Sequence, residues 1–141
     1  MANLTKIDVR IKTSDRNNAG TNGLVYLGIC GREFRCDSKK NDFERGSNRT
    51  YTFGDDSNVQ KADNNDPRKP QLSVEDADRF PVYIRFEQRT SSEWNLEQAT
   101  VHLNDSSFQN WESFVHPEGL WLGRSSGAFL YLNKHGAKPI T

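Results

Sequence analysis

Two loop-like segments hold the residues best suited to chemistry, because both are rich in the hard oxygen donors that calcium prefers. Residues 13–23 and 37–46 combine carboxylates and amides with backbone carbonyls that a glycine allows to turn inward. The candidate ligands are Asp15, Gly20, Thr21, Asn41, Asp42 and Glu44. If the segments meet, Asp15, Asp42 and Glu44 crowd negative charge at one rim, and a divalent cation would relieve the repulsion. The pattern therefore predicts a calcium site.

A purely structural interpretation of the same residues stays open, because Asp, Asn, Ser and Gly are also the usual residues of β-turns. The acidic run at residues 63–66 lacks the spacing of an EF-hand and is followed by Pro67. The histidines show no zinc-type spacing; they are His102, His116 and His135. Composition alone does not decide between a calcium site and ordinary turns.

Residues 123–127 match the Gly-x-Ser-x-Gly pattern of a nucleophilic serine. That motif needs a strand, a sharp turn and a helix, with an acid and then a histidine downstream. Here a strand-like pattern follows, and no acidic residue lies between the motif and His135. We expect a hairpin turn at this position and no enzymatic activity, since no pair of residues offers a credible nucleophile and base.

Apolar residues alternate with polar ones along most of the chain, which is typical of strands with one buried face. Ile7, Val9 and Ile11 show the pattern, and a shift of phase between Leu96 and Ala99 predicts a β-bulge. The expected strands span residues 7–11, 24–30, 33–37, 49–53, 82–86, 94–103, 119–122 and 128–132. About eight short strands separated by turns indicate an all-β fold, either a sandwich or a barrel.

Two stretches depart from the strand pattern. Residues 54–74 read as a long loop. Phe108, Trp111 and Phe114 recur at a helical spacing, which predicts one or two helical turns.

The totals restrict the class of function. The chain has 141 residues, so we expect one domain over residues 1–141. Lys plus Arg equal Asp plus Glu at 19 each, so no excess of positive charge favours nucleic acid or a polybasic lipid tether. The first residues lack the apolar run of a signal peptide and no stretch could span a bilayer, so we expect a cytoplasmic location, at most peripheral to a membrane. The spacing of Cys30 and Cys36 does not indicate a disulfide.

Three short elements in a fixed order resemble the PLAT family, which is named for polycystin, lipoxygenase and alpha-toxin. They are Ala-Gly-Thr at residues 19–21, Phe-Glu-Arg-Gly at 43–46 and Trp-Asn-Leu at 94–96. The resemblance covers residues 5–103, with closing strands over 119–132. It implies a sandwich of two four-stranded antiparallel sheets. It also implies a noncatalytic module that brings an enzyme or channel to a membrane or protein partner, often with calcium in the loops at one end.

The resemblance also implies roles for particular residues. The first two family loops map onto the calcium candidates given above, and a third loop adds Glu87, a longer acid than the usual Asp. Family members often present exposed apolar residues to a bilayer, and the candidates here are Phe108, Trp111 and Phe114. We favour the alternative that these three residues cap an open end of the sandwich. Trp94 is implied to be a core residue between the sheets.

The sequence thus predicts a noncatalytic, calcium-dependent module that docks to a membrane lipid surface or a protein partner. One alternative is a protein-interaction sandwich that needs no metal. Another is a carbohydrate-binding sandwich, which would use exposed aromatic residues such as Trp111, Trp121 and Tyr131. The particular lipid or partner and the oligomeric state do not follow from the sequence.

Overall fold

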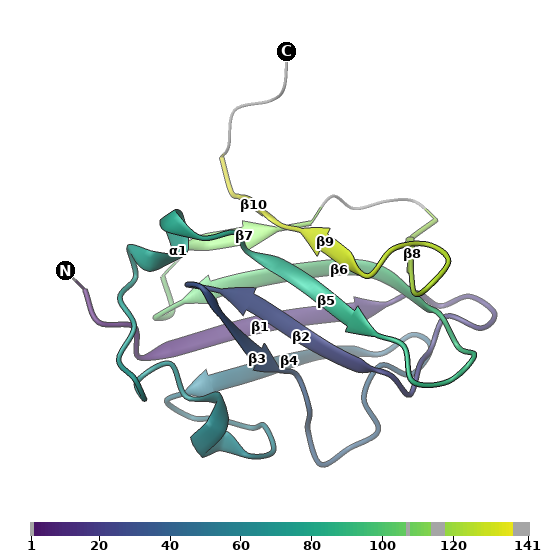
Figure 1. The fold of residues 1–141 in the computed structure, drawn as a ribbon, viewed down its shortest axis with the longest axis horizontal. Helices are drawn as coiled ribbons and strands as arrows, with labels where there is room; N and C mark the ends of the chain where they lie inside the picture. The colour runs from purple at the N-terminus through teal and green to yellow at the C-terminus, as the bar shows by residue number, and fades with distance from the viewer. Residues whose placement is uncertain (1, 107, 114–117, 137–141) are drawn as a thin grey trace.

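The computed structural model describes residues 2–106, 108–113 and 118–136, whose strands form two antiparallel sheets (Figure 1). The strands are β1 (Lys6–Thr13), β2 (Leu24–Ile29), β3 (Arg32–Arg35), β4 (Asn48–Gly54), β5 (Tyr83–Glu87), β6 (Trp94–Leu103), β7 (Asn110–Glu112), β8 (Leu120–Leu122), β9 (Phe129–Tyr131) and β10 (Asn133–Lys134). Two short helices are present, η1 (Ala62–Asn65) and α1 (Asp76–Arg79). Neither of these two helices is long and apolar enough to cross a membrane.

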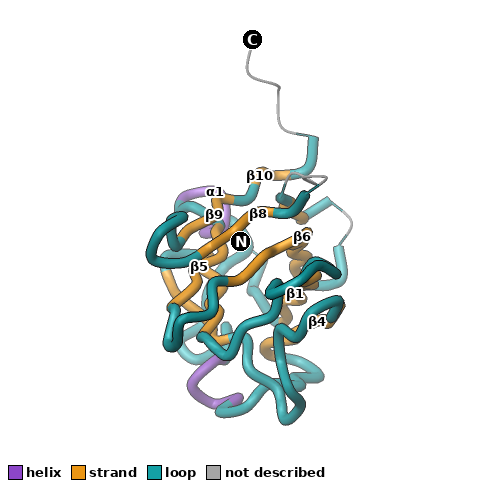
Figure 2. Tube along the Cα trace, turned by 90° about the vertical axis from the view of Figure 1, so that its right-hand side faces the viewer, coloured by secondary structure: helices purple, strands orange, loops and turns teal. Residues whose placement is uncertain are grey.

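The first sheet has six strands in the order β10-β7-β6-β1-β4, with β8 also paired to β6. β7 pairs with residues 100–102 of β6 and β8 with residues 94–96, so both lie along the edge of β6 that β1 leaves open. The second sheet has four strands in the order β3-β2-β5-β9, and Figure 2 shows the two sheets from one end. The predicted antiparallel sandwich is confirmed. The first sheet has six strands rather than four because two short strands share its fourth position and β10 is added beyond β7.

Trp94 belongs to the core between the two sheets and is fully buried. Its indole Nε1 donates a hydrogen bond to Thr13 Oγ1 at 2.9 Å. The ring centroids of Phe43 and Phe86 lie 5.3 and 5.7 Å from the Trp94 ring. A buried indole usually finds an acceptor for its N–H, and Trp94 has one. The predicted core role of Trp94 is confirmed.

Three local predictions from the sequence are also confirmed. The register of β1 against β6 shifts where the bulge was expected and leaves Glu97 as the extra residue. Cys30 and Cys36 are free and buried. Gly123 and Gly127 exchange backbone hydrogen bonds of 2.8 and 2.9 Å, which closes a hairpin turn around the serine motif.

The helical turns predicted over residues 108–114 are wrong for the described part of that range. Asn110–Glu112 form strand β7, in which Trp111 pairs with Val101 and is 4% exposed. Phe114 lies outside the described residues. The two helices occur instead at Ala62–Asn65 and Asp76–Arg79, and each has four residues. One turn is too short to produce a recognisable 3.6-residue period in the sequence.

Candidate functional site at the loop end

The two predicted calcium loops, residues 13–23 and 37–46 (the rim loops), meet at the end of the sandwich where β1 finishes and β4 begins (Figure 1). Thr21 N donates to Phe43 O at 3.0 Å, which joins the first rim loop to the second. Figure 2 turns this end toward the viewer and shows loops in front of the strand ends. The sequence-based calcium site required this meeting, and the requirement is met.

Arg45 strengthens the joint between the rim loops. Its Nε lies 2.9 Å from Asp15 Oδ1, and its Nη1 donates to Asn17 Oδ1 at 3.0 Å. The next residue, Gly46, donates its N–H to Ser14 O at 3.1 Å. The Arg-Gly part of the second sequence element therefore holds the first loop in place.

Gly20 is required by the close approach of the two loops. A Cβ atom at this position would lie 2.8 Å from Arg45 N and 3.2 Å from Phe43 O. Both contacts are with backbone atoms, which cannot move aside as a flexible side chain can. The glycine thus lets the two backbones touch, whereas the sequence had indicated a role in turning a carbonyl inward.

A pocket of about 270 Å³ opens between the rim loops and brings together four of the predicted ligands. These four are Thr21, Asn41, Asp42 and Glu44. Asp37 also lines the pocket, together with the cations Arg35 and Lys40. The pocket thus offers carboxylate and amide oxygens, and positive side chains lie beside them.

Asp42 already accepts three hydrogen bonds from the protein. Its Oδ2 accepts from Ser38 N at 2.8 Å, and its Oδ1 accepts from Ser38 Oγ at 2.7 Å and from Tyr51 Oη at 2.8 Å. A carboxylate has about four lone-pair sites, so roughly one site of Asp42 remains for another ligand. Burial and the neighbouring Asp42 charge raise the pKa of Tyr51, which keeps its hydroxyl a donor. Asp42 is therefore an anchor of the second rim loop as well as a candidate ligand.

Asp37 faces the same pocket and was not identified as a ligand from the sequence. Burial raises the pKa of Asp37, and the nearby Asp42 carboxylate raises it further, against the opposing effect of Arg35. Two carboxylates close together are a local excess of negative charge that a cation would relieve. The sequence did not identify Asp37, because its place at the start of the second rim loop does not indicate that Asp42 folds back toward it.

Comparison with solved structures identifies the fold. An alpha-toxin from Clostridium absonum superposes with a TM-score of 0.63 and 27% sequence identity, over 94% of this chain and 32% of that chain. The chain has a PLAT-like fold. Alpha-toxin from an avian strain of Clostridium perfringens superposes with a TM-score of 0.59 and 24% sequence identity, over 94% of this chain and 31% of that chain. Coral 8R-lipoxygenase, described as activated by calcium through a C2-like domain, superposes with a TM-score of 0.58 and 18% sequence identity. That match covers 91% of this chain and 16% of the lipoxygenase chain.

The PLAT-like chain spans about a third of the alpha-toxin chains and about a sixth of the lipoxygenase chain, by the coverages of 32%, 31% and 16%. No family model and no curated protein matches the sequence. The resemblance to the PLAT family that the sequence indicated is confirmed by the fold shared with these solved structures.

Other predicted ligands of the PLAT-like rim lie outside the pocket. The Asp15 carboxylate is 81% exposed and is paired with Arg45. Glu87 ends β5 opposite Leu24, and its carboxylate lies 3.5 Å from Arg89 Nη2. Among the described residues, no three His, Cys, Asp or Glu side chains are grouped closely enough to hold a metal ion. A calcium ion in this pocket would therefore have to draw on amide or carbonyl oxygens as well.

The two predicted membrane-contact residues that the structure describes, Phe108 and Trp111, do not form an exposed group at the rim. Trp111 is buried, and Lys134 Nζ lies 5.3 Å from its ring centroid. Phe108 is 87% exposed, but it follows β6 at the end where Leu103 pairs with Ile7, opposite to the rim loops. Neither of these two residues therefore lies exposed beside the rim loops, and their assignment to a bilayer contact or to a cap on an open end stays a prediction.

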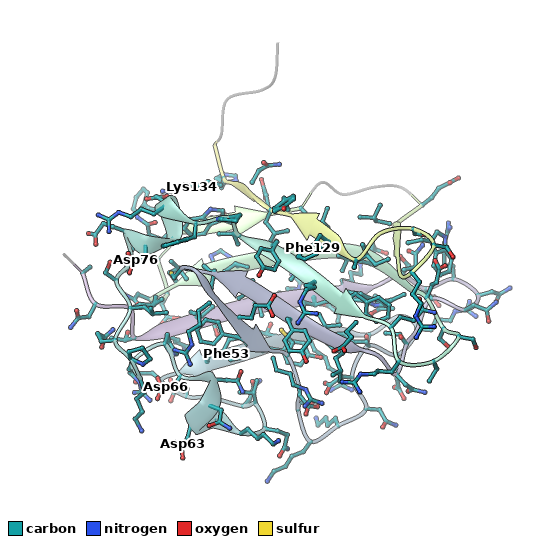
Figure 3. All side chains as sticks on the ribbon, viewed as in Figure 1. Phe53, Asp63, Asp66, Asp76, Phe129 and Lys134 are labelled. Atoms are coloured by element: carbon teal, nitrogen blue, oxygen red, sulfur yellow. The ribbon has the colours of Figure 1, made fainter. Side chains whose placement is uncertain are left out.

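The three aromatic residues predicted for a carbohydrate site differ in their exposure to solvent. Trp111 is buried and Trp121 is partly buried, whereas Tyr131 is 63% exposed. The ring of Tyr131 lies 6.4 Å from that of Phe129, which is 50% exposed on β9 at the edge of the second sheet (Figure 3). An aromatic surface is present, and of its two members Tyr131 was predicted and Phe129 was not.

Proposed function

We propose that this PLAT-like sandwich is a noncatalytic docking module that attaches to a lipid surface through its rim loops. The observation that carries the proposal is the joining of two loops, far apart in sequence, into one pocket of oxygen donors at the end of the sandwich. Loops held on a rigid β-scaffold are common sites of recognition. The fold shared with an alpha-toxin and a calcium-activated lipoxygenase supports the same function.

The noncatalytic part of the proposal is supported by the serine motif. Ser125 lies in a turn closed by hydrogen bonds between Gly123 and Gly127, and β9 follows it. A nucleophile elbow instead leads from a strand into a helix, whose start helps to stabilise the oxyanion. The motif therefore lacks the structural context of a catalytic serine.

Calcium is the finer part of the proposal. The carboxylate, amide and hydroxyl side chains of the rim pocket offer oxygens, which is the ligand type that calcium prefers, so these groups fit the ion. The residues that would hold it are Asp37, Thr21, Asn41, Asp42 and Glu44. Bound calcium would supply a positive charge able to accept a lipid phosphate as an outer ligand. Because Asp42 has about one free site, we expect weak binding, with a dissociation constant of about 10⁻⁴–10⁻³ M.

Two measurements test the proposal. Calorimetry with calcium chloride should show binding to the wild type, and Glu44→Gln should weaken it because Glu44 lines the pocket. A matched control is Asp105→Asn, which removes a carboxylate paired with Lys6 at the opposite end. Sedimentation with phosphatidylserine-containing vesicles should require calcium and be reversed by a chelator. Vesicle binding that a chelator leaves unchanged would favour the metal-independent alternative.

Asp15→Asn discriminates between two ligand sets. The sequence assigns Asp15 to the site, whereas the structure pairs it with Arg45 outside the pocket. If calcium binding survives in Asp15→Asn and is lost in Glu44→Gln, the pocket residues hold the ion. Loss of binding in both variants would restore the sequence-based set, which contains Asp15 as well as Glu44, and would indicate that the rim loops rearrange on binding.

A further inference from the structure

The segment over residues 54–74 gains a structural role that its sequence did not reveal. The Asn58 side chain makes the two hydrogen bonds to the edge of β4 that a neighbouring strand would otherwise make. Its Oδ1 accepts from Thr52 N at 2.9 Å and its Nδ2 donates to Thr50 O at 2.8 Å. Gln60 N donates to Asp37 O at 2.8 Å, beyond the end of β3. The segment thus bridges β4, at the edge of the first sheet, and β3, at the edge of the second (Figure 1).

Asn65 fixes the segment a second time. Its Oδ1 accepts from Arg35 N on β3 at 2.9 Å, and its Nδ2 donates to Lys61 O at 3.1 Å. The helix η1 that contains it lies at the lower edge of the view in Figure 3, where Asp63 and Asp66 are labelled. Residues 57–61 are therefore held at both ends and can form a rigid wall.

A pocket of about 670 Å³ lies against this wall and has a one-sided charge. Its lining contains four cations and no carboxylate; the cations are Lys39, Lys40, Arg49 and Lys61. None of the four forms an ion pair with a carboxylate of the described residues. The lining also offers the hydroxyls of Ser57 and Thr50 and the amide of Asn58. Such a pocket attracts an anion that accepts hydrogen bonds.

Arg49 gives an independent sign that an acceptor is missing. It shares the inward phase of β4 with Tyr51 and Phe53, both of which are buried. Its Nε is buried and has no hydrogen-bond partner within the protein. Buried donors are nearly always satisfied, so an unpaired one beside a cavity points to a ligand or water that supplies the acceptor.

We propose that this cationic pocket binds a multiply phosphorylated group, either a free sugar or inositol phosphate or the headgroup of a phosphorylated lipid. The volume of about 670 Å³ falls within the range of small-molecule sites, roughly 300–1,000 Å³. Four cations around one cavity exceed what a single phosphate would neutralise, whereas several phosphates would use them all. The pocket is a different site from the rim pocket, although Lys40 lines both.

Calorimetry with inositol trisphosphate, in a chelator so that calcium plays no part, tests the pocket directly. The wild type should bind, and the double variant Lys39→Gln with Lys61→Gln should lose affinity by about tenfold or more, since it removes two of the four cations. Both side chains are exposed, so the variant should fold. The control Lys69→Gln with Arg89→Gln removes the same charge outside the pocket and should bind as the wild type does.

Equal loss of affinity in both double variants, or no binding by the wild type, would overturn the proposal. Vesicles of phosphatidylcholine with and without phosphatidylinositol bisphosphate then separate the two sources of phosphate. Sedimentation with the phosphorylated vesicles, competed by free inositol trisphosphate, identifies a lipid headgroup. Binding of the soluble compound without sedimentation identifies a free solute. Because a chelator is present throughout, failure of calcium-dependent docking through the rim loops would leave this result intact.

Discussion

Asp37 is a carboxylate whose surroundings disfavour its charge. Burial and the adjacent Asp42 raise the pKa of Asp37 above its ordinary value, and Arg35 at 3.6 Å opposes the shift only in part. A carboxyl whose pKa is raised by folding destabilises the folded state when it is ionised. The penalty is relieved as the pH falls through the raised pKa, and it vanishes below the unfolded value.

Asp37→Asn should therefore unfold at a higher urea concentration than the wild type near neutral pH. The difference should disappear at about pH 3, where Asp37 is protonated in both folded and unfolded chains. Urea denaturation at the two pH values measures this. A less stable variant at neutral pH would mean that the pairing with Arg35 outweighs burial. The same variant should weaken any calcium-induced rise in stability, because Asp37 lines the rim pocket.

At the scale of elements, the contact between the rim loops depends on Gly20. Gly20→Ala should push Arg45 and Phe43 away and destabilise the protein by about 1–3 kcal/mol, the usual cost of overpacking. Hydrogen exchange would show the local cause: the amides of Thr21 and Gly46, which donate between the loops, should lose protection. Unchanged protection at both amides would contradict the role assigned to the glycine.

In the second sheet, Gly28 on β2 leaves room for a side chain of β5 to cross the strand and reach β3. Gly28 pairs with Glu33 on one side and with Tyr83 on the other, and a Cβ at Gly28 would lie 2.0 Å from Tyr83 Cζ. The Tyr83 ring thus crosses the glycine, and its hydroxyl donates to Glu33 Oε2 at 2.7 Å. Arg85 completes the network with two bonds of 2.9 Å to Glu33. The bonds from Arg85, with Tyr83 assisting, lower the pKa of Glu33.

Glu33→Gln should destabilise the protein by about 1 kcal/mol near neutral pH, because it removes the charge that Arg85 pairs with. A carboxyl with a lowered pKa stabilises the fold above its unfolded value, and this contribution is lost as the pH falls through the folded value. The gap between wild type and variant in urea denaturation should therefore narrow as the pH falls below the unfolded value, and it should close once Glu33 is protonated in the folded state. A gap that persists there would assign the effect to packing and not to charge.

The sequence could predict the strands because their period-2 alternation is local, as in β1, where Ile7, Val9 and Ile11 are all buried. It could also single out the rim loops as oxygen-rich segments, and the structure joins them at one end of the sandwich. It could not show that Asp42 is largely occupied by Ser38 and Tyr51, because those bonds depend on how the loop folds back. The sharing of one sheet position by β7 and β8 likewise depends on tertiary pairing.

At the scale of the whole molecule, a neutral total conceals separated charges. Lys plus Arg and Asp plus Glu are equal at 19 each, yet the pocket beside residues 57–61 contains four cations and no carboxylate. Carboxylates gather instead in the adjoining rim pocket, where Asp37 and Asp42 lie close together. Net charge therefore did not exclude a phosphate site, because the fold sorts residues that the sequence intermixes.

The positions of the rim loops and Phe108 at opposite ends of the sandwich predict the orientation of a docked molecule. Asn17→Cys places a thiol on the rim and Phe108→Cys places one at the far end, and each can carry an environment-sensitive fluorophore. Labelling should be selective, because burial raises the pKa of both native thiols, that of Cys30 to about 12, and so suppresses their reactive thiolates.

With calcium and phosphatidylserine-containing vesicles, the fluorophore at position 17 should shift to shorter wavelength, because it enters the interface. The fluorophore at position 108 should keep the spectrum of the free protein. A shift at position 108 alone would place the bilayer at the far end and return Phe108 to the contact role that the family resemblance had implied. Equal shifts at both positions would indicate that the molecule lies along the membrane, with its long edges and not its rim in contact.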